Sequence, residues 1–326
     1  MMRKVRFPAL AVLLATASLI GTVVAQQKKA VSPANPPPAA AGEDDADTIT
    51  FQSALVNTYV TVRDANGRLV SGLTRNDFIV LDNGKEQPIT YFSQESSQPL
   101  RVVLVIDRSR SVQRELARAK TAAQDFFTSV LRPGKDRAAV VAFDSGVYLL
   151  QDFTDNAAVL TSAVSGLTSS GGTSIFDAVY KATRDMLPNG QNARRVIILV
   201  TDGHDTTSQA SITEAIEMAS KNNVIIYAVR VPGEGSLNVR DLRGRPVLDR
   251  LTQATGGGDV YFDGNQNQLA GFLAKVGDEL RSEYSIGYQF TDSIASPSYH
   301  KLTISVRSNS GSLRAFTRKG YYSGGQ

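Results

Sequence analysis

The chain contains no cysteine among its 326 residues. This absence excludes disulfide bonds, a thiol nucleophile and a lipid-modified cysteine behind an export signal. Histidine is almost as scarce, with His204 and His300 as the only two imidazoles. The sequence also lacks the Gly-x-Ser-x-Gly and Gly-x-x-x-x-Gly-Lys-Ser/Thr motifs. The usual signatures of serine hydrolases and of phosphate-binding loops are therefore missing.

A large excess of one charge is missing too. The chain has 35 basic and 31 acidic residues, and three of the basic ones lie within residues 1–25. The remainder carries 32 basic residues against 31 acidic ones, so we expect neither nucleic acid nor an anionic membrane surface as partner. Hydrophobic residues make up 42% of the chain, which is typical of a globular protein with a sizeable core.

The first 47 residues indicate export rather than a folded domain. Arg3, Lys4 and Arg6 precede an apolar run that ends in small residues near Ala25. This pattern predicts a cleaved signal peptide over residues 1–25, and hence a periplasmic or extracellular protein. The run is long enough for an uncleaved anchor as an alternative, the one expected contact with a membrane. Residues 26–47 are rich in proline, alanine and charge, which predicts a disordered linker.

Both ends of the remaining chain have the pattern of antiparallel strands. Residues 48–98 contain short β-rich segments separated by Asn66-Gly67 and Asp82-Asn83-Gly84, which favour hairpin turns. Residues 283–326 show strict alternation of apolar and polar side chains, typical of half-buried strands. The N-terminal unit is thin for independent stability. We therefore expect the two ends to form one small antiparallel β-sandwich.

Residues 99–282 alternate between buried-type strands and helices. Short continuous apolar runs such as Val102–Ile106, Arg137–Phe143 and Val224–Val231 are typical of strands covered on both faces. The segments between them have helical periodicity. The fold class predicted is α/β, a doubly wound, mostly parallel sheet flanked by helices, with the β-sandwich added.

Oxygen-bearing side chains follow the first of these strands. Asp107, Ser109 and Ser111 stand at i, i+2 and i+4 in the turn after Ile106. Open α/β sheets bind ligands at the carboxyl ends of their strands. Short oxygen donors without thiol or imidazole suit a hard divalent cation such as Mg²⁺. The alternative is an ordinary turn in which Ser111 caps the following helix.

Two further oxygen-bearing residues fall at neighbouring loops. Asp202 follows a second buried-type strand, and Thr173 follows Gly171-Gly172, where the backbone can approach a ligand closely. Ser174 and Asp177 fit a capping box for the next helix, which leaves Thr173 outside it. We expect both residues to lie near Asp107, although Thr173 could also be an ordinary loop hydroxyl.

From about Leu100 to Arg281 the sequence closely resembles a von Willebrand factor type A (integrin I-like) domain. The metal-ion-dependent adhesion site of that family is Asp-x-Ser-x-Ser, then Thr, then Asp, and all five positions match, at Asp107, Ser109, Ser111, Thr173 and Asp202. With Leu73-Thr-x-x-Asp-Phe78, Asp-Asn-Gly-Lys85 and Arg-Lys-Gly-Tyr-Tyr322, the whole chain resembles bacterial exported proteins related to this domain.

The resemblance implies a mechanism. The five residues would coordinate Mg²⁺, with Mn²⁺ or Ca²⁺ as alternatives, and an open coordination position would take an Asp or Glu carboxylate from a protein partner. Four residues would lie on the rim of the site, where charged members could orient that carboxylate. They are Arg108, Arg110, Gly172 and His204.

The function predicted is an exported, metal-dependent protein-binding module for adhesion or interaction, and not an enzyme. One alternative is a structural module of the cell envelope whose metal site is unused. A metal-dependent hydrolase built on Asp107, Asp202 and His204 is a further alternative. Against it, Ser109 stands where an enzyme that forms an aspartyl phosphate would carry a second acid.

Overall fold

The computed structural model describes residues 54–94, 98–189, 193–232, 240–258, 260–262, 268–290, 298–307 and 312–323. The predicted signal peptide and linker lie outside these residues, and the predicted domain boundaries stay predictions. Within the described ranges, no helix has the length and apolar character needed to cross a membrane.

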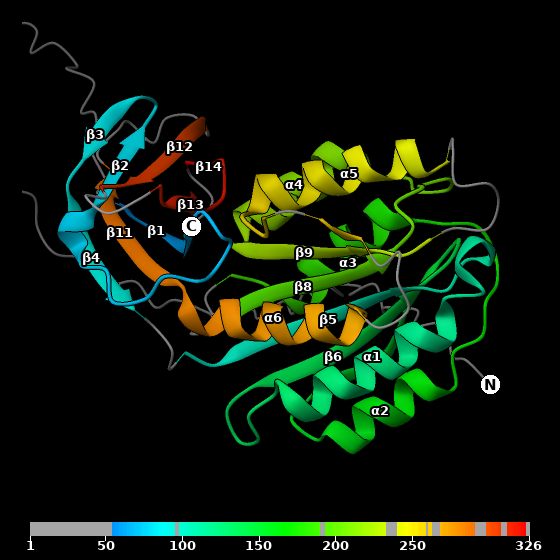
Figure 1. Ribbon diagram of the computed structural model, residues 1–326. Coiled ribbons are helices and arrows are strands. Elements are labelled where there is room, and N and C mark those ends of the chain that lie inside the picture. Colours follow the sequence, from blue (N-terminus) through cyan, green and yellow to red (C-terminus); the bar gives the residue numbers. More distant parts are fainter. Residues whose placement is uncertain are drawn as a thin grey trace, which may run out of the picture. The chain divides into compact units, whose positions relative to one another are not determined.

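A six-stranded sheet forms the centre of the α/β region, in the order β10-β9-β8-β5-β6-β7 (Figure 1). Its strands pair in parallel, except that β7 runs antiparallel to β6 at the edge. The strands are β5 (Leu100–Asp107), β6 (Arg137–Phe143), β7 (Val147–Thr154), β8 (Arg194–Thr201), β9 (Val224–Arg230) and β10 (Tyr261–Phe262).

Six helices cover the two faces of this sheet. The helices α1 (Leu116–Ser129), α2 (Ala157–Ser165) and α6 (Gln268–Ser282) lie on one face, and α3 (Ile175–Met186), α4 (Ile212–Lys221) and α5 (Arg240–Thr255) on the other (Figure 1). Successive residues of β5 belong to opposite cores: Val102 and Leu104 to the first, and Val103 and Val105 to the second. Because both faces are covered, the strand needs apolar residues without alternation.

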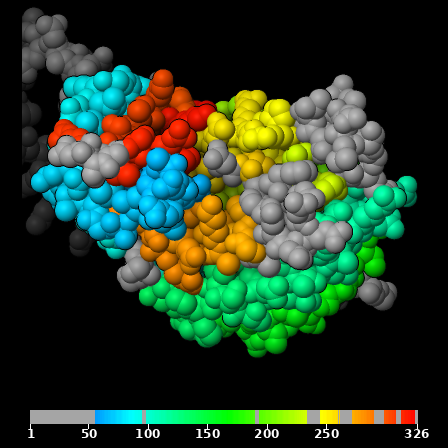
Figure 2. Space-filling model, in the orientation of Figure 1, coloured from blue at the N-terminus to red at the C-terminus, as the bar shows by residue number. Residues whose placement is uncertain are grey.

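The β-sandwich consists of two four-stranded sheets, β13-β1-β11-β4 and β14-β12-β2-β3. Strands from the two ends of the chain pair directly, β1 with β11 and β2 with β12. Figure 2 shows the same union on the surface, where blue and cyan N-terminal atoms adjoin orange and red C-terminal ones. The strands are β1 (Ala54–Arg63), β2 (Phe78–Asp82), β3 (Lys85–Gln87), β4 (Ile89–Gln94), β11 (Tyr284–Phe290), β12 (Tyr299–Val306), β13 (Arg314–Phe316) and β14 (Gly320–Tyr322). The predicted fold class is confirmed.

A buried polar junction joins the sandwich to the α/β region. Glu283 separates α6 from β11, and it is 1% exposed. Its carboxylate accepts hydrogen bonds from the hydroxyls of Thr61 and Tyr227, at 3.3 and 3.1 Å, and forms an ion pair with Arg194 at 3.2 Å. Buried charges need such partners, because leaving one unpaired is costly.

Candidate metal centre

The candidate site lies where the path of the chain through the sheet reverses. From β5 the chain first adds β6 and β7 on one side, and then β8 on the other side. Because β5 and β8 are parallel neighbours, with Ile106 opposite Val200, both strands end at the same edge. The Thr201 hydroxyl at the end of β8 donates a hydrogen bond of 2.6 Å to Asp107 Oδ2 at the end of β5. Such a switch point is the usual ligand site of an open α/β sheet.

The turn after β5 gathers its oxygens without capping a helix. The Ser109 amide donates to Asp107 Oδ1 at 2.8 Å, and the hydroxyls of Ser109 and Ser111 are 3.0 Å apart. A short 3₁₀ turn follows, and α1 begins only at Leu116 with Glu115 as its N-cap residue. The alternative that Ser111 caps the helix is therefore wrong.

Two buried acids meet at this edge. Asp107 is 2% exposed and Asp202 is 7% exposed, and neither forms an ion pair with a basic side chain of the described residues. Burial raises the pKa of Asp107 to about 7, and the charge of Asp202 adds to the increase, against the hydrogen bonds from Thr201 and Ser109. Buried carboxylates are ordinarily paired or bound to a metal ion.

Thr173 is fixed through its backbone while its hydroxyl stays uncommitted. Its amide donates to the Thr206 hydroxyl at 2.9 Å, and its carbonyl accepts from the amides of Thr206 and Thr207 at 2.8 and 3.1 Å. The residue is 3% exposed, yet within the part of the chain that the structure describes its hydroxyl forms no hydrogen bond. The loop after Asp202 therefore holds Thr173, and its side-chain oxygen can serve a ligand.

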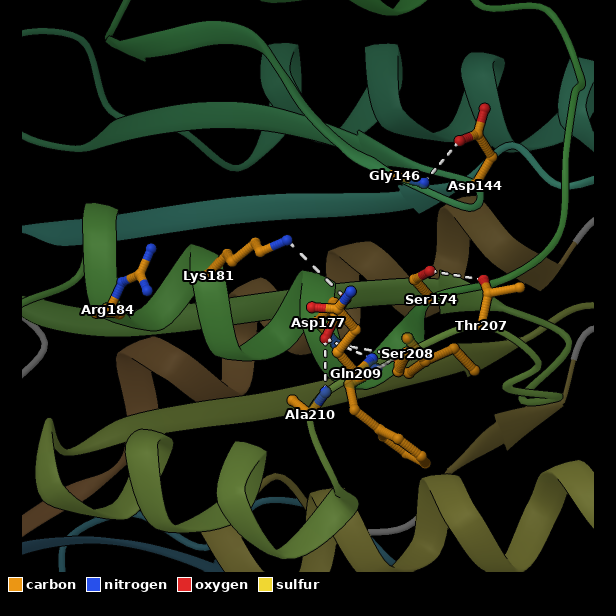
Figure 3. A network of polar contacts seen from close by, with 12 residues as sticks. Asp144, Gly146, Ser174, Asp177, Lys181, Arg184, Thr207, Ser208, Gln209 and Ala210 are labelled. Carbon is orange, nitrogen blue, oxygen red and sulfur yellow. Dashed lines mark hydrogen bonds and ion pairs between the residues drawn. The ribbon is translucent and has the colours of Figure 1, made fainter. Parts of the chain in front are cut away.

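The predicted capping box at Ser174 and Asp177 is wrong. The Ser174 side chain accepts no hydrogen bond from the amides of its own helix, and its hydroxyl instead lies 2.7 Å from that of Thr207 (Figure 3). The helix is capped from another loop, because Asp205 Oδ2 accepts the Ile175 amide at 2.7 Å. The Ser-x-x-Asp spacing is correct for a capping box, but the carboxylate of Asp205, distant in sequence, occupies the helix terminus instead.

Asp177 has its own partners on that second loop. Its Oδ1 accepts the amides of Gln209 and Ala210, at 3.1 and 2.8 Å (Figure 3). Ser208 completes the exchange, because its hydroxyl accepts the Phe176 amide at 3.0 Å. The first turn of α3 and the loop after Asp202 thus each accept backbone amides of the other. These contacts were not predicted from the sequence, since no local spacing connects the residues that make them.

The four predicted rim residues differ in their exposure and in the partners that they already have. Arg108 is 7% exposed, and it forms an ion pair of 3.0 Å with Asp144. Arg110 is exposed, and His204 is half-buried with its amide donating to Asp202 Oδ1 at 3.0 Å. Gly172 donates its amide to Ser145 Oγ at 2.7 Å. Their role toward a ligand stays a prediction.

The donor set at this edge fits a hard cation. The described residues contain no group of three His, Cys, Asp or Glu side chains that could hold a metal ion. A site here would instead combine two carboxylates with three neutral hydroxyls, those of Ser109, Ser111 and Thr173. All five donors are oxygens, the preference of Mg²⁺, Mn²⁺ and Ca²⁺. Zinc sites are more often built from nitrogen and sulfur ligands.

Comparison with known proteins gives a family match within the α/β region. The family model of the von Willebrand factor type A domain matches residues 102–204, a range that includes all five candidate ligands. No curated protein matches the chain.

Solved structures give weaker likenesses. A conserved hypothetical protein, BatB from Bacteroides thetaiotaomicron, is 19% identical with a TM-score of 0.45, covering 56% of this chain and 97% of its own. A von Willebrand factor type A protein from Catenulispora acidiphila is 15% identical with a TM-score of 0.48, covering 84% and 75%. Proximal thread matrix protein 1 from the mussel byssus is 20% identical with a TM-score of 0.48, covering 61% of this chain but only 50% of its own.

Proposed function

We propose that the sheet edge at β5 and β8 holds a divalent cation and that the protein binds a protein partner through it. The family match over residues 102–204 supports an interaction module of the von Willebrand factor type A kind. One observation carries the metal: Asp107 and Asp202 are buried side by side, and no basic side chain of the described residues pairs with either. A bound cation would offset the energetic cost of burying the two carboxylates and the repulsion between them.

The five proposed ligands are of two kinds, charged carboxylates and neutral hydroxyls. Asp107 and Asp202 would supply the negative charge, while Ser109, Ser111 and Thr173 would supply neutral oxygens. When bound, the ion would supply an electrophilic position for an Asp or Glu carboxylate of the partner. Mg²⁺ is the ion proposed, with Mn²⁺ or Ca²⁺ as alternatives.

The surrounding contacts would orient these donors before any ion binds. The Thr201 hydroxyl and the Ser109 amide fix the two oxygens of Asp107. The His204 amide holds Asp202 Oδ1. Such outer contacts keep ligating side chains in place and tune their affinity.

The rim would meet the partner next to its carboxylate. Arg110 and His204 are the proposed contacts, because both retain exposed surface. Gly172 would permit close approach of the partner because it has no side chain. A Cβ there would also lie 3.0 Å from Ser145 Oγ of the neighbouring loop. Arg108 is buried and would support the rim through its ion pair with Asp144. The partner proposed is a protein that offers an acidic side chain.

The setting proposed is outside the cytoplasm. Residues 1–25 would direct export, residues 26–47 would form the linker, and the protein would act in the periplasm or beyond the cell. We propose residues 99–282 as the binding domain, with residues 48–98 and 283–326 as its β-sandwich. Adhesion or another interaction at the cell surface would follow from this arrangement.

Calorimetric titration with Mg²⁺ and Mn²⁺ tests the proposal. We expect the wild-type protein to bind one ion, and Asp107→Ala and Asp202→Ala to remain folded but bind none. Glu86→Ala removes an exposed carboxylate of the sandwich and is the matched control, expected to bind as the wild type does. An array of Asp- and Glu-containing peptides, probed in Mg²⁺ and in EDTA, then tests the carboxylate. Failure of the wild type to bind either ion would favour a structural module whose metal site is unused.

A further inference from the structure

A second polar cluster lies in the β-sandwich and is not used by the proposed metal site. In it, Asp82, His300 and Ser298 form a continuous chain of hydrogen bonds. His300 Nδ1 is 2.9 Å from Asp82 Oδ1, and His300 Nε2 is 3.0 Å from Ser298 Oγ. Asp82 ends β2. His300 lies in the antiparallel partner strand β12, and Ser298 directly precedes that strand. A serine, an imidazole and a buried carboxylate in this order are the components of a hydrolytic triad.

The carboxylate of Asp82 is held by donors on its other side. Asp82 is 5% exposed, and its Oδ2 accepts hydrogen bonds from the hydroxyls of Tyr288 and Tyr321, at 2.9 and 2.6 Å. Burial raises the pKa of both tyrosines above its ordinary value, with the Asp82 charge adding to the increase. They therefore stay protonated donors, and they leave Oδ1 to face the imidazole.

The contacts of His300 select the tautomer that a general base requires. Asn83 Nδ2 lies 3.3 Å from Nδ1, farther than Asp82 Oδ1, and Asn83 Oδ1 is held by the Lys301 amide at 2.9 Å. An ionised carboxylate can only accept, so the shorter contact places the hydrogen on Nδ1. Nε2 then presents its lone pair to Ser298. The ring is 3% exposed and stacks on Tyr321 with centroids 5.0 Å apart, so its orientation is fixed.

Ser298 combines an exposed position with a fixed backbone. The residue is exposed, whereas the imidazole behind it is buried. Its amide donates to Ser323 Oγ at 3.0 Å, and its carbonyl accepts the Ser323 amide at 2.9 Å. Ser298 Oγ also lies 3.0 Å from Ser323 Oγ. Because the residue is exposed, a reagent in solvent can approach it, and both hydrogen-bond partners of its hydroxyl are already in place.

We propose that Ser298 is a nucleophile activated by His300, with Asp82 as the positioning residue, and that it reacts with activated carboxylic esters. Ser298 Oγ would bond to the ester carbonyl carbon while its proton passes to His300 Nε2. Collapse of the tetrahedral adduct would break the bond to the alcohol oxygen, which takes that proton and leaves. Water would then attack the acyl-serine, lose a proton to Nε2 and release the acid, with the proton returned to Ser298.

The surroundings restrict the substrate class to esters with good leaving groups. The backbone amides of Ser298 and Ser323 are both engaged with each other's residue, so these two donors do not receive a developing oxyanion. One such donor is worth about a hundredfold to a thousandfold in rate. Peptide bonds are therefore not the expected substrate, and an aryl ester is.

The test uses a fluorophosphonate probe read by intact mass and peptide mapping, beside hydrolysis of p-nitrophenyl acetate. We expect one adduct, on Ser298, and its loss in Ser298→Ala. In His300→Gln the labelling rate should fall by about a hundredfold or more, the usual contribution of a general base. Ser305→Ala, which removes an exposed serine of the same strand outside the cluster, should label at close to the wild-type rate. EDTA should leave labelling unchanged, because the cluster is separate from the metal site.

Structural damage is separated from loss of the base by two readouts. Each variant is compared by thermal unfolding, and the labelling rate of the wild type is measured against pH. The wild type should show a pH dependence that His300→Gln lacks. An unlabelled wild type, an adduct that persists in Ser298→Ala, or an unchanged rate in folded His300→Gln would each overturn the proposal.

Discussion

Replacement of Asp107 by asparagine should make the metal-free protein more stable. The change keeps the size of a side chain that is 2% exposed and removes its charge. The asparagine can still accept the Ser109 amide through Oδ1, and its NH₂ group can donate to the Thr201 hydroxyl. Stabilisation by loss of a ligating group is the behaviour expected of a functional site that is strained without its ligand.

The magnitude follows from the carboxyl pKa. Burial, with the charge of Asp202, raises the pKa of Asp107 from 3.8 to about 7. A tenfold change in proton affinity corresponds to about 1.4 kcal/mol, so the ionised form costs the folded state about 4 kcal/mol. The imperfect hydrogen bonds of an amide reduce the gain. We expect the free energy of unfolding to rise by about 2–4 kcal/mol at pH 8 in EDTA.

The sign of the pH dependence is fixed by the direction of this shift. Because the pKa of Asp107 is higher in the folded state, the folded protein binds more protons between pH 3.8 and about 7. Its stability therefore falls as pH rises through this window, and the cost is fully present above it. Urea unfolding in EDTA should show the gain of Asp107→Asn at pH 8 and its disappearance near pH 4. In Mg²⁺ the wild type should gain stability by mass action, and the variant should not.

Asp144→Asn is the matched control, since it makes the same chemical change at the same edge of the sheet. Asp144 forms an ion pair with Arg108, and both side chains are under 10% exposed. Removing its charge breaks this buried ion pair, so we expect a loss of about 3–5 kcal/mol. The reasoning is refuted if Asp107→Asn is less stable than the wild type at pH 8 in EDTA, or if both variants change stability in the same direction.

Three further predictions concern the supports of the fold. Asp205→Ala removes the cap of α3 and should weaken Mg²⁺ affinity about tenfold in calorimetry, whereas Ser211→Ala, a cap lost from α4, should leave it unchanged. Glu283→Gln leaves the buried Arg194 without its counter-charge and should cost about 3–5 kcal/mol in urea unfolding. The third concerns Asp136, where burial opposes ionisation but hydrogen bonds from Arg132 and Leu100 lower the pKa of the carboxyl group. The ionised carboxylate should therefore add to the free energy of unfolding above pH 3.8, and this stabilisation should be lost below it. Unfolding of Asp136→Asn and wild type at pH 7 and pH 3 measures that difference.

The sequence contained enough local information for the elements of the fold. Continuous apolar runs identified the covered strands, because residues such as Val102 and Val103 enter opposite cores and both must be apolar. The alternation in residues 283–326 likewise identified half-buried strands. What joins the sandwich to the sheet was not predictable, since Glu283 reaches Thr61, 222 residues away in sequence.

At the candidate site, too, local motifs were predictable from the sequence and contacts between distant residues were not. The aspartates and hydroxyls were visible as short motifs at strand ends, and the sheet brings Asp107 and Thr201 within hydrogen-bond distance. The helix cap was misread, because Ser174 has the right spacing to Asp177 while Asp205 satisfies the Ile175 amide from 30 residues away. The local sequence shows which residue can cap a helix. It does not show whether the tertiary fold places another acceptor at the helix terminus.

Buried acids give the physical criterion that separates support from function in this protein. Asp136, Asp144 and Glu283 each face a guanidinium, so folding alone accounts for them. Asp107 shares its site with another carboxylate, and neither pairs with a basic side chain of the described residues. Asp82 is surrounded by two phenols and an imidazole, and Arg318 lies over the ring of Tyr321, one of those phenols. Charge buried without a permanent counter-charge destabilises the fold, and such a cost is typical of sites that act on a ligand. This criterion therefore selects the cation site at the sheet edge. The serine site rests instead on the geometry of Asp82, His300 and Ser298, so the two proposed assays can fail independently.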